Sequence, residues 1–238
     1  EVTAMRFQKY YEADTSITLE GTKTMADADK ALSAGAFEFE VKENGTVVAT
    51  GTNDASGKIT FTDIHYEYNA SRNDLGEHTY EITEVQPTEG DAYVYDQRVK
   101  KVVVKVTDNG NGTLKAEIVE DSSDAIAFEN DTIEVSFKKT DVAGEEIPGA
   151  ELAIYESSNG EKGEEITSWT SDGSAHVVKG QLVAGKEYIL EETKAPAGYV
   201  KAQSIVFRIN DDRSVTVVDG ELDEDGSIVM VDETTSVR

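Results

Sequence analysis

Apolar and polar residues alternate along most of the chain with the two-residue period that is typical of β-strands. Turn-forming clusters rich in Gly, Asn and Asp separate the alternating segments at the spacing of β-hairpins. This pattern predicts an all-β sandwich in the first half of the chain. The predicted strands of that half lie at residues 36–41, 58–61, 78–85, 99–106 and 113–119, and a short helix is predicted at 25–32.

A second set of strand-like segments begins at Ile133 and ends at Val231. Because the pattern restarts there, the sequence predicts two modules with a boundary at residues 130–132. The link is short and polar, so we expect the modules to be stacked end to end with limited hinge freedom. The predicted fold class is all-β, with two tandem immunoglobulin-like β-sandwich modules at residues 1–131 and 132–238.

Six polar residues fall on the inward-facing side of predicted strands, because side chains two positions apart share one face. In the segment HTYEITEV, for example, Glu84 follows Tyr80 and Ile82 on the apolar face. The last predicted strand, which carries Asp232, is apolar on both faces. Strand parity therefore defines the direction of the Asp232 side chain less well than that of the other five residues. The six residues are Lys23, Glu84 and Asn130 in the first half, and Lys139, Glu192 and Asp232 in the second.

A single inward lysine or glutamate has an ordinary explanation. A lysine at a strand end can extend its ammonium group to water, and a glutamate there can lie at the rim of the sandwich. The order Lys in the first strand, Glu in a middle strand and Asn or Asp in the last strand occurs twice, however. The first and last strands of a sandwich can be neighbours, so we expect each lysine to meet its acceptor beside the glutamate.

Such a buried group of residues can form a covalent bond. Burial lowers the pKa of a lysine and raises that of a glutamic acid, because desolvation penalises the charged forms. The neutral amine is then a nucleophile, and Glu84 or Glu192 would donate a hydrogen bond to the acceptor carbonyl and carry the proton to the leaving group. The predicted reaction is the single-turnover formation of an isopeptide bond, which releases ammonia from Asn130 or water from Asp232.

Composition excludes several other kinds of function. The net charge of −26 disfavours nucleic acid and anionic membranes as partners, and the absence of cysteine excludes disulfides and thiolate metal sites. His65, His78 and His176 lie in no nucleophile or metal motif, so we expect no cofactor and no enzyme that acts on external substrates. The acidic stretch at residues 219–226 is interpreted as a solvated loop, with adventitious Ca²⁺ binding as the alternative.

Short motifs in both halves resemble those of Gram-positive surface proteins. The first half contains GTKTM, AGAFEFEV, GKITF, YEITEV and FEN in that order, and it resembles the streptococcal pilin isopeptide-linkage domain. The second half contains KTD, PGAEL, YILEETKAPAGY and IVMVD, and it is similar to a collagen-adhesin B-type domain. The resemblance implies Lys23, Glu84 and Asn130 as one crosslinking triad, and Lys139, Glu192 and Asp232 as the other.

Two details of the second triad qualify this resemblance. Parity and the KTD motif favour Lys139 as the nucleophile over its neighbour Lys138. Asp232 departs from the commoner Asn acceptor of the B-type family, so the resemblance implies water as the leaving group.

The resemblance implies a shaft or stalk segment of a pilin or adhesin that is extracellular and anchored to the cell wall. Its expected partners are neighbouring modules of a longer chain or pilus subunits. The alternative is a ligand-binding adhesin module that recognises a host protein or glycan. An aromatic groove around Tyr66, Tyr68 and Tyr93 would favour that alternative.

The ends of the chain also resemble module junctions. FQKYYEA at residues 7–13 resembles the closing strand and linker of a preceding module, with Lys9 in the place of an acceptor Asn. TTSVR at the C-terminus resembles the lead into a following module. Because the sequence opens at Glu1 without a signal peptide and has no membrane-spanning apolar run, we expect a fragment of a longer array.

Overall fold

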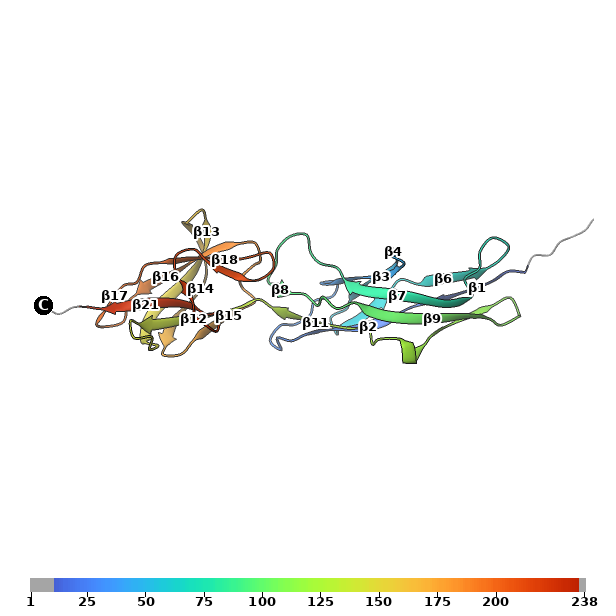
Figure 1. Cartoon of the computed structure of the whole chain (residues 1–238), viewed down its shortest axis with the longest axis horizontal. Helices are drawn as coiled ribbons and strands as arrows, with labels where there is room; N and C mark the ends of the chain where they lie inside the picture. Colours follow the sequence, from blue (N-terminus) through green and yellow to red (C-terminus); the bar gives the residue numbers. More distant parts are fainter. Residues whose placement is uncertain (1–10, 236–238) are drawn as a thin grey trace, which may run out of the picture. The chain divides into compact units, whose positions relative to one another are not determined.

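The computed structural model of the protein describes residues 11–235, which form two compact units (Figure 1). Within the described residues, unit 1 consists of 11–86 and 95–130, and unit 2 consists of 87–94 and 131–235. Both units are built almost entirely from β-strands, which confirms the predicted all-β class. No helix in this range is long and apolar enough to cross a membrane.

The prediction of a short helix at residues 25–32 is wrong, because this segment forms bends and turns. The Asp27 carboxylate accepts a hydrogen bond from the backbone N–H of Asp29 at 3.0 Å, and the Asp27 carbonyl accepts that of Lys30 at 3.1 Å. Local hydrogen bonds of this kind compete with a helix. The helical structure in the described part of the chain is a single 3₁₀ turn, η1 (Glu120–Ser122).

The strands of unit 1 form one long sheet and one short sheet. Their bounds are β1 (Ala13–Ile17), β2 (Glu20–Met25), β3 (Glu38–Glu43), β4 (Thr46–Asn53), β5 (Lys58–Phe61), β6 (Ile64–Tyr68), β7 (Gly76–Glu84), β9 (Lys100–Asp108), β10 (Leu114–Ile118) and β11 (Ala127–Thr132). The long sheet has the order β10-β9-β7-β3-β4-β5-β2-β11, and β1 pairs with β6 in the short sheet. Each strand predicted for the first half overlaps one of these strands.

The long sheet of unit 1 folds over, so that strands distant in its order share a core. The ring of Phe39 on β3 lies 5.1 Å from that of Phe128 on β11 and 6.5 Å from that of Phe61 on β5. Yet β4, β5 and β2 separate β3 from β11 in the sheet order. Strand β11 therefore faces β3 across the apolar core, as in a sandwich.

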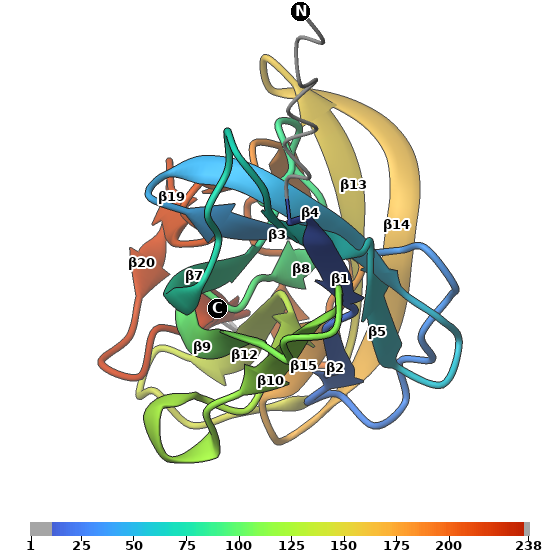
Figure 2. The same ribbon diagram turned by 90° about the vertical axis from the view of Figure 1, so that its right-hand side faces the viewer.

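Unit 2 consists of two sheets. Its strands are β8 (Tyr93–Val94), β12 (Glu134–Asp141), β13 (Pro148–Ser158), β14 (Glu161–Asp172), β15 (His176–Lys179), β16 (Glu187–Lys194), β17 (Tyr199–Val200), β18 (Ile205–Ile209), β19 (Val215–Val217), β20 (Glu221–Leu222) and β21 (Ile228–Thr234). One sheet has the order β15-β12-β21-β17, with β20 also paired to β21, and the other has the order β14-β13-β16-β18-β19. The long hairpin of β13 and β14 is prominent in Figure 2.

Aromatic side chains from both sheets meet in the core of unit 2. Phe137 on β12 packs against Phe207 on β18, and Tyr188 on β16 packs against the same ring, each with 5.6 Å between centroids. The Tyr188 hydroxyl accepts a hydrogen bond from the backbone N–H of Val183 at 2.8 Å, so this buried polar group is satisfied. The two sheets therefore form the sandwich that the alternating pattern predicts.

A short segment from the first half of the sequence belongs to unit 2. Residues 87–94 include β8, which pairs with Asp131 and Thr132. The carbonyl of Asp91 accepts a hydrogen bond from the backbone N–H of Ala184 at 2.9 Å. Membership of the units therefore does not follow sequence order throughout.

In each unit, a strand near the start of the unit pairs in parallel with its last long strand. In unit 1, β2 lies beside β11, with Lys23 opposite Phe128. In unit 2, β12 lies beside β21, with Lys139 opposite Met230 (Figure 1). Parallel neighbours cannot be joined by a short hairpin, and here almost the whole unit lies between the two paired strands in sequence.

Gly57, in the turn between β4 and β5, should tolerate substitution less well than Gly45, in the turn between β3 and β4. Gly57 has a φ of 89°, its carbonyl accepts the backbone N–H of Lys23, and an added Cβ would lie 2.2 Å from the Lys23 carbonyl oxygen. Gly45 has a φ of 81° but open space around it. Gly45→Ala should therefore lower the free energy of unfolding by about 1 to 2 kcal/mol, and Gly57→Ala should lower it clearly more. Scanning calorimetry measures both losses. Equal losses would contradict the close approach.

Candidate functional site

Three polar side chains meet inside unit 1, and we call them site 1: Lys23 on β2, Glu84 on β7 and Asn130 on β11. Their exposed fractions are 1%, 5% and 0%. The Lys23 Nζ atom lies 3.0 Å from Oε1 of Glu84, which also accepts a hydrogen bond from Nδ2 of Asn130 at 2.7 Å. The structure thus brings together the three residues that the sequence selects in the first half.

Burial sets the protonation of site 1. Desolvation lowers the pKa of Lys23 and raises the pKa of Glu84, and the hydrogen bond between them opposes both shifts. The rings of Phe37 and Phe39 lie 4.7 Å and 6.0 Å from the Lys23 Nζ atom. These apolar neighbours and the two directions of shift favour a neutral amine beside a protonated carboxyl group.

The carbonyl of Asn130 is bound by a residue that the sequence reasoning missed. The backbone N–H of Asp96 donates to Oδ1 of Asn130 at 2.8 Å. The expectation that Glu84 donates to this carbonyl is therefore wrong, because Glu84 contacts the amide nitrogen instead. Asp96 lies in an irregular segment before β9, where strand parity provides no signal.

Three side chains form the equivalent group in unit 2, which we call site 2: Lys139 on β12, Glu192 on β16 and Asp232 on β21. Their exposed fractions are 4%, 0% and 0%. The Lys139 Nζ atom contacts Oδ1 of Asp232 and lies 3.4 Å from Oε1 of Glu192. Oε2 of Glu192 accepts a hydrogen bond from the backbone N–H of Ala202 at 2.6 Å.

Site 2 contains two buried acids, and ionising both of them would cost free energy because two like charges would lie close together in the core. Burial raises the pKa of Glu192, and the neighbouring Asp232 carboxyl group adds to the rise, whereas the Ala202 N–H and the contact with Lys139 oppose it. Oε1 of Glu192 and Oδ2 of Asp232 are buried without a hydrogen-bond partner in the described structure. Because a buried carboxylate with one oxygen short of a hydrogen bond and a second acid beside it is costly, a proton on Glu192 is favoured.

Lys138, the rival of Lys139, lies on the other face of β12. Its Nζ atom is 2.6 Å from Oδ2 of both Asp223 and Asp225, and these contacts raise its pKa. Lys138 is therefore held as a cation at the acidic loop. Its side chain is directed away from the core and from site 2.

The two sites share one strand register. Each lysine lies opposite the residue two positions before its acceptor on the parallel neighbour: Phe128 precedes Asn130, and Met230 precedes Asp232. Because side chains two positions apart share a face, the lysine and the acceptor point into the same core. The third member, the glutamate, reaches them from a different strand, β7 or β16.

The three histidines lie on strands, but none of them is part of either site. The ring of His65 hydrogen-bonds to Glu67, and that of His78 to Glu43, whereas the ring of His176 stacks on that of Trp169 with 4.3 Å between centroids. Between residues 11 and 235, no group of three or more His, Asp or Glu side chains could hold a metal ion.

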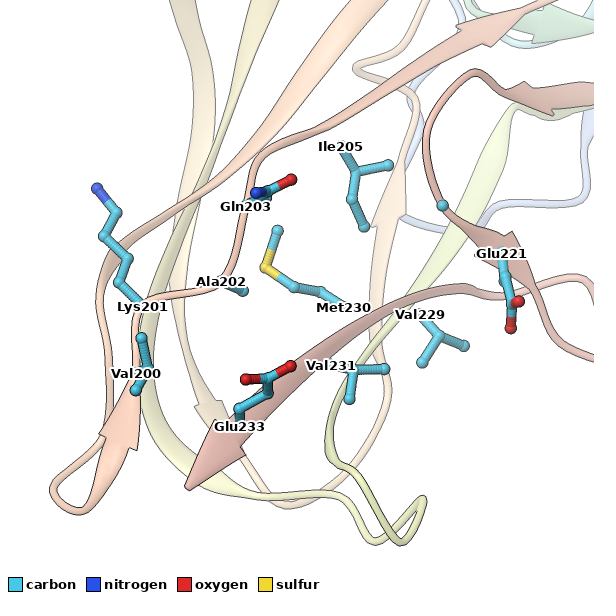
Figure 3. Close-up of a pocket in the computed structure, with 11 residues that line it drawn as sticks. Val200, Lys201, Ala202, Gln203, Ile205, Glu221, Val229, Met230, Val231 and Glu233 are labelled. Atoms are coloured by element: carbon cyan, nitrogen blue, oxygen red, sulfur yellow. The ribbon is translucent and has the colours of Figure 1, made fainter. Parts of the chain in front are cut away.

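Of the three tyrosines that would mark an aromatic groove, Tyr66 lines a small pocket of unit 1 with Tyr80, whereas Tyr68 and Tyr93 are not part of its lining. The Tyr66 side chain is 2% exposed, and its hydroxyl is hydrogen-bonded to that of Tyr80 at 2.7 Å. A groove does lie beside β21 in unit 2, between Met230 and Glu233 on one side and Ala202 and its neighbours on the other (Figure 3). Its lining contains no aromatic residue and none of the three residues of site 2.

The fold and the two sites define a tandem β-sandwich protein with one buried lysine-centred triad in each unit. Residues 19–132 match the family of the Spy0128-like isopeptide containing domain (FctA), and residues 133–221 match the SpaA prealbumin-like fold domain. Each half of the chain therefore matches the model of a different family, which confirms the resemblance to domains of Gram-positive pilins and surface adhesins. Asp232 lies beyond the second match. Among curated proteins, no sequence matches the chain.

Several solved structures are similar to this chain. The Bacillus anthracis TIE protein is 25% identical over 91% of the chain, with a TM-score of 0.40, and the chain spans 34% of its length. The C-terminal fragment of the pilus adhesin SpaC from Lactobacillus rhamnosus GG is 16% identical, with coverages of 93% and 99% and a TM-score of 0.47. The major pilin T-13 from Streptococcus pyogenes is 18% identical, with coverages of 94% and 99% and a TM-score of 0.39.

The predicted junctions to neighbouring modules fall at the margins of the described structure. Lys9 and most of the 7–13 segment lie outside the described residues, as does the end of the C-terminal TTSVR segment. Both junctions stay predictions from the sequence.

Replacing Lys23 with Met should make the stability of unit 1 fall as the pH rises above 4.5, the ordinary pKa of glutamic acid. The buried Glu84 keeps a raised pKa without a nearby cation, so the folded state holds a proton that the unfolded state releases. Stability should be greatest below that pH and decline until the pH passes the raised pKa of the folded state. Urea unfolding at a series of pH values measures this slope.

The matched control is the double variant Lys23→Met with Glu84→Gln, which removes the titrating group and keeps its shape. The control should lose the slope that Glu84 causes. An identical pH dependence in both variants would contradict the burial of a titrating Glu84.

Proposed function

We propose that the chain is a structural shaft or stalk segment of a Gram-positive surface pilin or adhesin, with each module closed by an intramolecular isopeptide bond. The bonds join Lys23 to Asn130 with Glu84 as the promoting acid, and Lys139 to Asp232 with Glu192 as the promoting acid. Each bond forms once, so the protein is a self-crosslinking structural protein and not an enzyme with external substrates.

One observation carries this proposal: each unit buries a lysine beside an acid and an acceptor, with the same register between parallel strands. Burying three ionisable or polar groups in an apolar core costs stability unless they pair. A neutral amide bond removes that cost, because it needs only hydrogen bonds. The membership of residues 19–132 in an isopeptide-containing family supports the same reaction.

In site 1, the neutral amine of Lys23 attacks Cγ of Asn130. Glu84 contacts both the attacking nitrogen and the leaving nitrogen, at 3.0 Å and 2.7 Å, so it can give a proton to one and take a proton from the other. A new C–N bond forms, the bond from Cγ to Nδ2 breaks, and ammonia leaves. Positioning of this kind supplies an effective molarity of about 10⁵ to 10⁸ M.

In site 2, the neutral amine of Lys139 attacks Cγ of Asp232 in its carboxylic acid form. A C–N bond forms, the bond from Cγ to the hydroxyl oxygen breaks, and the hydroxyl group leaves as water with a proton from Glu192, which regains a proton from the attacking nitrogen. The raised pKa of Glu192 supports its role as the proton donor. The amide product contains no ionisable group, so it removes the conflict between the two buried acids.

The bonds would stabilise the modules in two ways. Lys23 and Asn130 are 107 positions apart (130 − 23), and Lys139 and Asp232 are 93 apart. By analogy with disulfides, loops of this length contribute about 4 to 5 kcal/mol through the entropy of the unfolded chain. A bond between the parallel strands would also transmit tension directly across the module, so the intervening strands would not unravel.

This function implies an extracellular location and partners that are neighbouring modules or pilus subunits. We do not extend the proposal to a host ligand, because Tyr66 is buried and the groove beside β21 has no aromatic lining. The net charge of −26 suits a soluble, densely displayed segment, since like charges oppose side-by-side association.

The intact mass of the denatured protein should be lower than the sequence mass by one ammonia and one water, because each bond expels one leaving group. Mass spectrometry measures this directly. Lys23→Ala should restore the ammonia and leave the water missing. A full calculated mass would contradict both bonds, and loss of ammonia alone would contradict the assignment of Asp232.

Lys138 and Lys139 provide a matched pair for identifying the second nucleophile. Lys139→Arg should abolish the loss of water, because a guanidinium group is not nucleophilic in proteins. Lys138→Arg should leave it unchanged, since this side chain is paired with Asp223 and Asp225. Tryptic mapping of the crosslinked peptide measures both variants, and the reverse result would exchange the two roles.

A further inference from the structure

The amide group of Asn130 is fixed at both ends. Its nitrogen donates to Glu84 at 2.7 Å, and its oxygen accepts from the backbone N–H of Asp96 at 2.8 Å. A backbone N–H can only donate, so the oxygen of the amide must be the atom on that side. The leaving nitrogen is therefore directed at the proton carrier, and the carbonyl oxygen at a fixed donor.

The segment that supplies this donor is itself held in place. The Asp96 carboxylate is nearly buried and forms an ion pair with Arg98 at 2.5 Å. The same carboxylate accepts hydrogen bonds from the backbone N–H groups of Arg98 and Glu129, both at 3.0 Å. Because Glu129 directly precedes Asn130 on β11, the side chain of Asp96 fastens its own backbone to the strand that carries the acceptor.

We propose that the backbone N–H of Asp96 is the oxyanion donor of site 1. This role rests on the isopeptide reaction proposed above. When the Lys23 amine adds to Cγ of Asn130, the π electrons of the carbonyl move to Oδ1, which becomes negatively charged. The 2.8 Å distance is within the range of effective oxyanion donors, and a donor already in place requires no reorganisation in a dry core. When the oxyanion collapses, Nδ2 leaves as ammonia with the proton from Glu84.

Arg98 has a different role in this proposal. It does not touch the reacting atoms but binds both carboxylate oxygens of Asp96, at 2.8 Å and 2.5 Å. It is therefore a positioning residue that keeps Asp96 charged and its segment against β11. The Arg98 contact holds the pKa of Asp96 well below its ordinary value, which agrees with this role.

Site 2 has no equivalent donor in the described structure. Oδ2 of Asp232 is buried without a hydrogen-bond partner, and the nearby backbone N–H of Ala202 binds Glu192 instead. Removal of the Asp96 donor should therefore affect the first bond alone. This difference makes the second bond an internal reference for synthesis and folding.

The test replaces the Asp96 N–H by an oxygen atom and keeps the side chain. Cell-free synthesis of the full chain with malic acid, the α-hydroxy analogue of aspartic acid, at position 96 makes this ester. The matched control is the ester made with 2-hydroxyisovaleric acid, the α-hydroxy analogue of valine, at position 103, because the N–H of the buried Val103 donates to Oγ of Ser123 at 2.9 Å in the same unit, away from site 1. Mass spectrometry after synthesis follows the loss of ammonia and of water with time.

The ester at position 96 should slow the loss of ammonia on the order of 10²-fold, whereas the ester at position 103 should leave it at the rate of the unmodified chain. Equal rates for the two esters would overturn the proposal. If the unmodified chain loses no ammonia, both this proposal and the first isopeptide bond fail. Normal ammonia loss in the unmodified chain, without an effect at position 96, overturns the Asp96 role alone.

A second pair of variants covers the case in which the ester at position 96 does not fold. Arg98→Ala should slow the loss of ammonia and leave the loss of water unchanged, because it loosens only the segment that positions Asp96. Arg98→Lys keeps a cation beside Asp96 and should restore most of the rate. If Arg98→Ala reacts at the unmodified rate, or if Arg98→Lys is no faster than Arg98→Ala, the proposal is overturned.

Discussion

Desolvation of an amine beside a carboxyl group is the interaction on which both units depend. In site 1, the sandwich surrounds Lys23 and Glu84 with apolar rings, so each group approaches its neutral form. An exposed pair of the same residues would stay charged and unreactive, because water stabilises the ammonium and the carboxylate. The apolar core therefore acts as both the stabilising element of the fold and the source of the proposed chemistry.

The parallel pairing of distant strands means that the proposed bond would crosslink a whole module. Antiparallel neighbours are often joined by a short hairpin, and a bond between them would close only a small loop. β2 and β11, like β12 and β21, are separated by most of their unit. The proposed bond at this position would constrain nearly every strand of the module, which would suit the proposed role as a shaft or stalk segment.

The two sites reach the same arrangement with different polar neighbours. In site 1, backbone and side-chain groups satisfy both ends of the Asn130 amide. In site 2, the available N–H of Ala202 binds Glu192, and one oxygen of Asp232 is left without a partner. For the proposed reaction, the Asn130 amide is therefore already oriented. The Asp232 carboxyl group would instead be oriented by its contact with Lys139 and would rely on a proton at Glu192.

The sequence by itself determined many of the strands and the inward direction of five of the six site residues, because the two-residue period is a local property of the backbone. The strand of Asp232 is apolar on both faces, so the direction of that side chain was decided by the tertiary structure. The sequence did not determine the conformation of residues 25–32, where hydrogen bonds of Asp27 replace the expected helix. Only the tertiary structure decided that Glu84 contacts the amide nitrogen of Asn130 and that Asp96 binds its oxygen. These contacts depend on an irregular segment packing against a strand distant in sequence, and no periodic pattern encodes such packing.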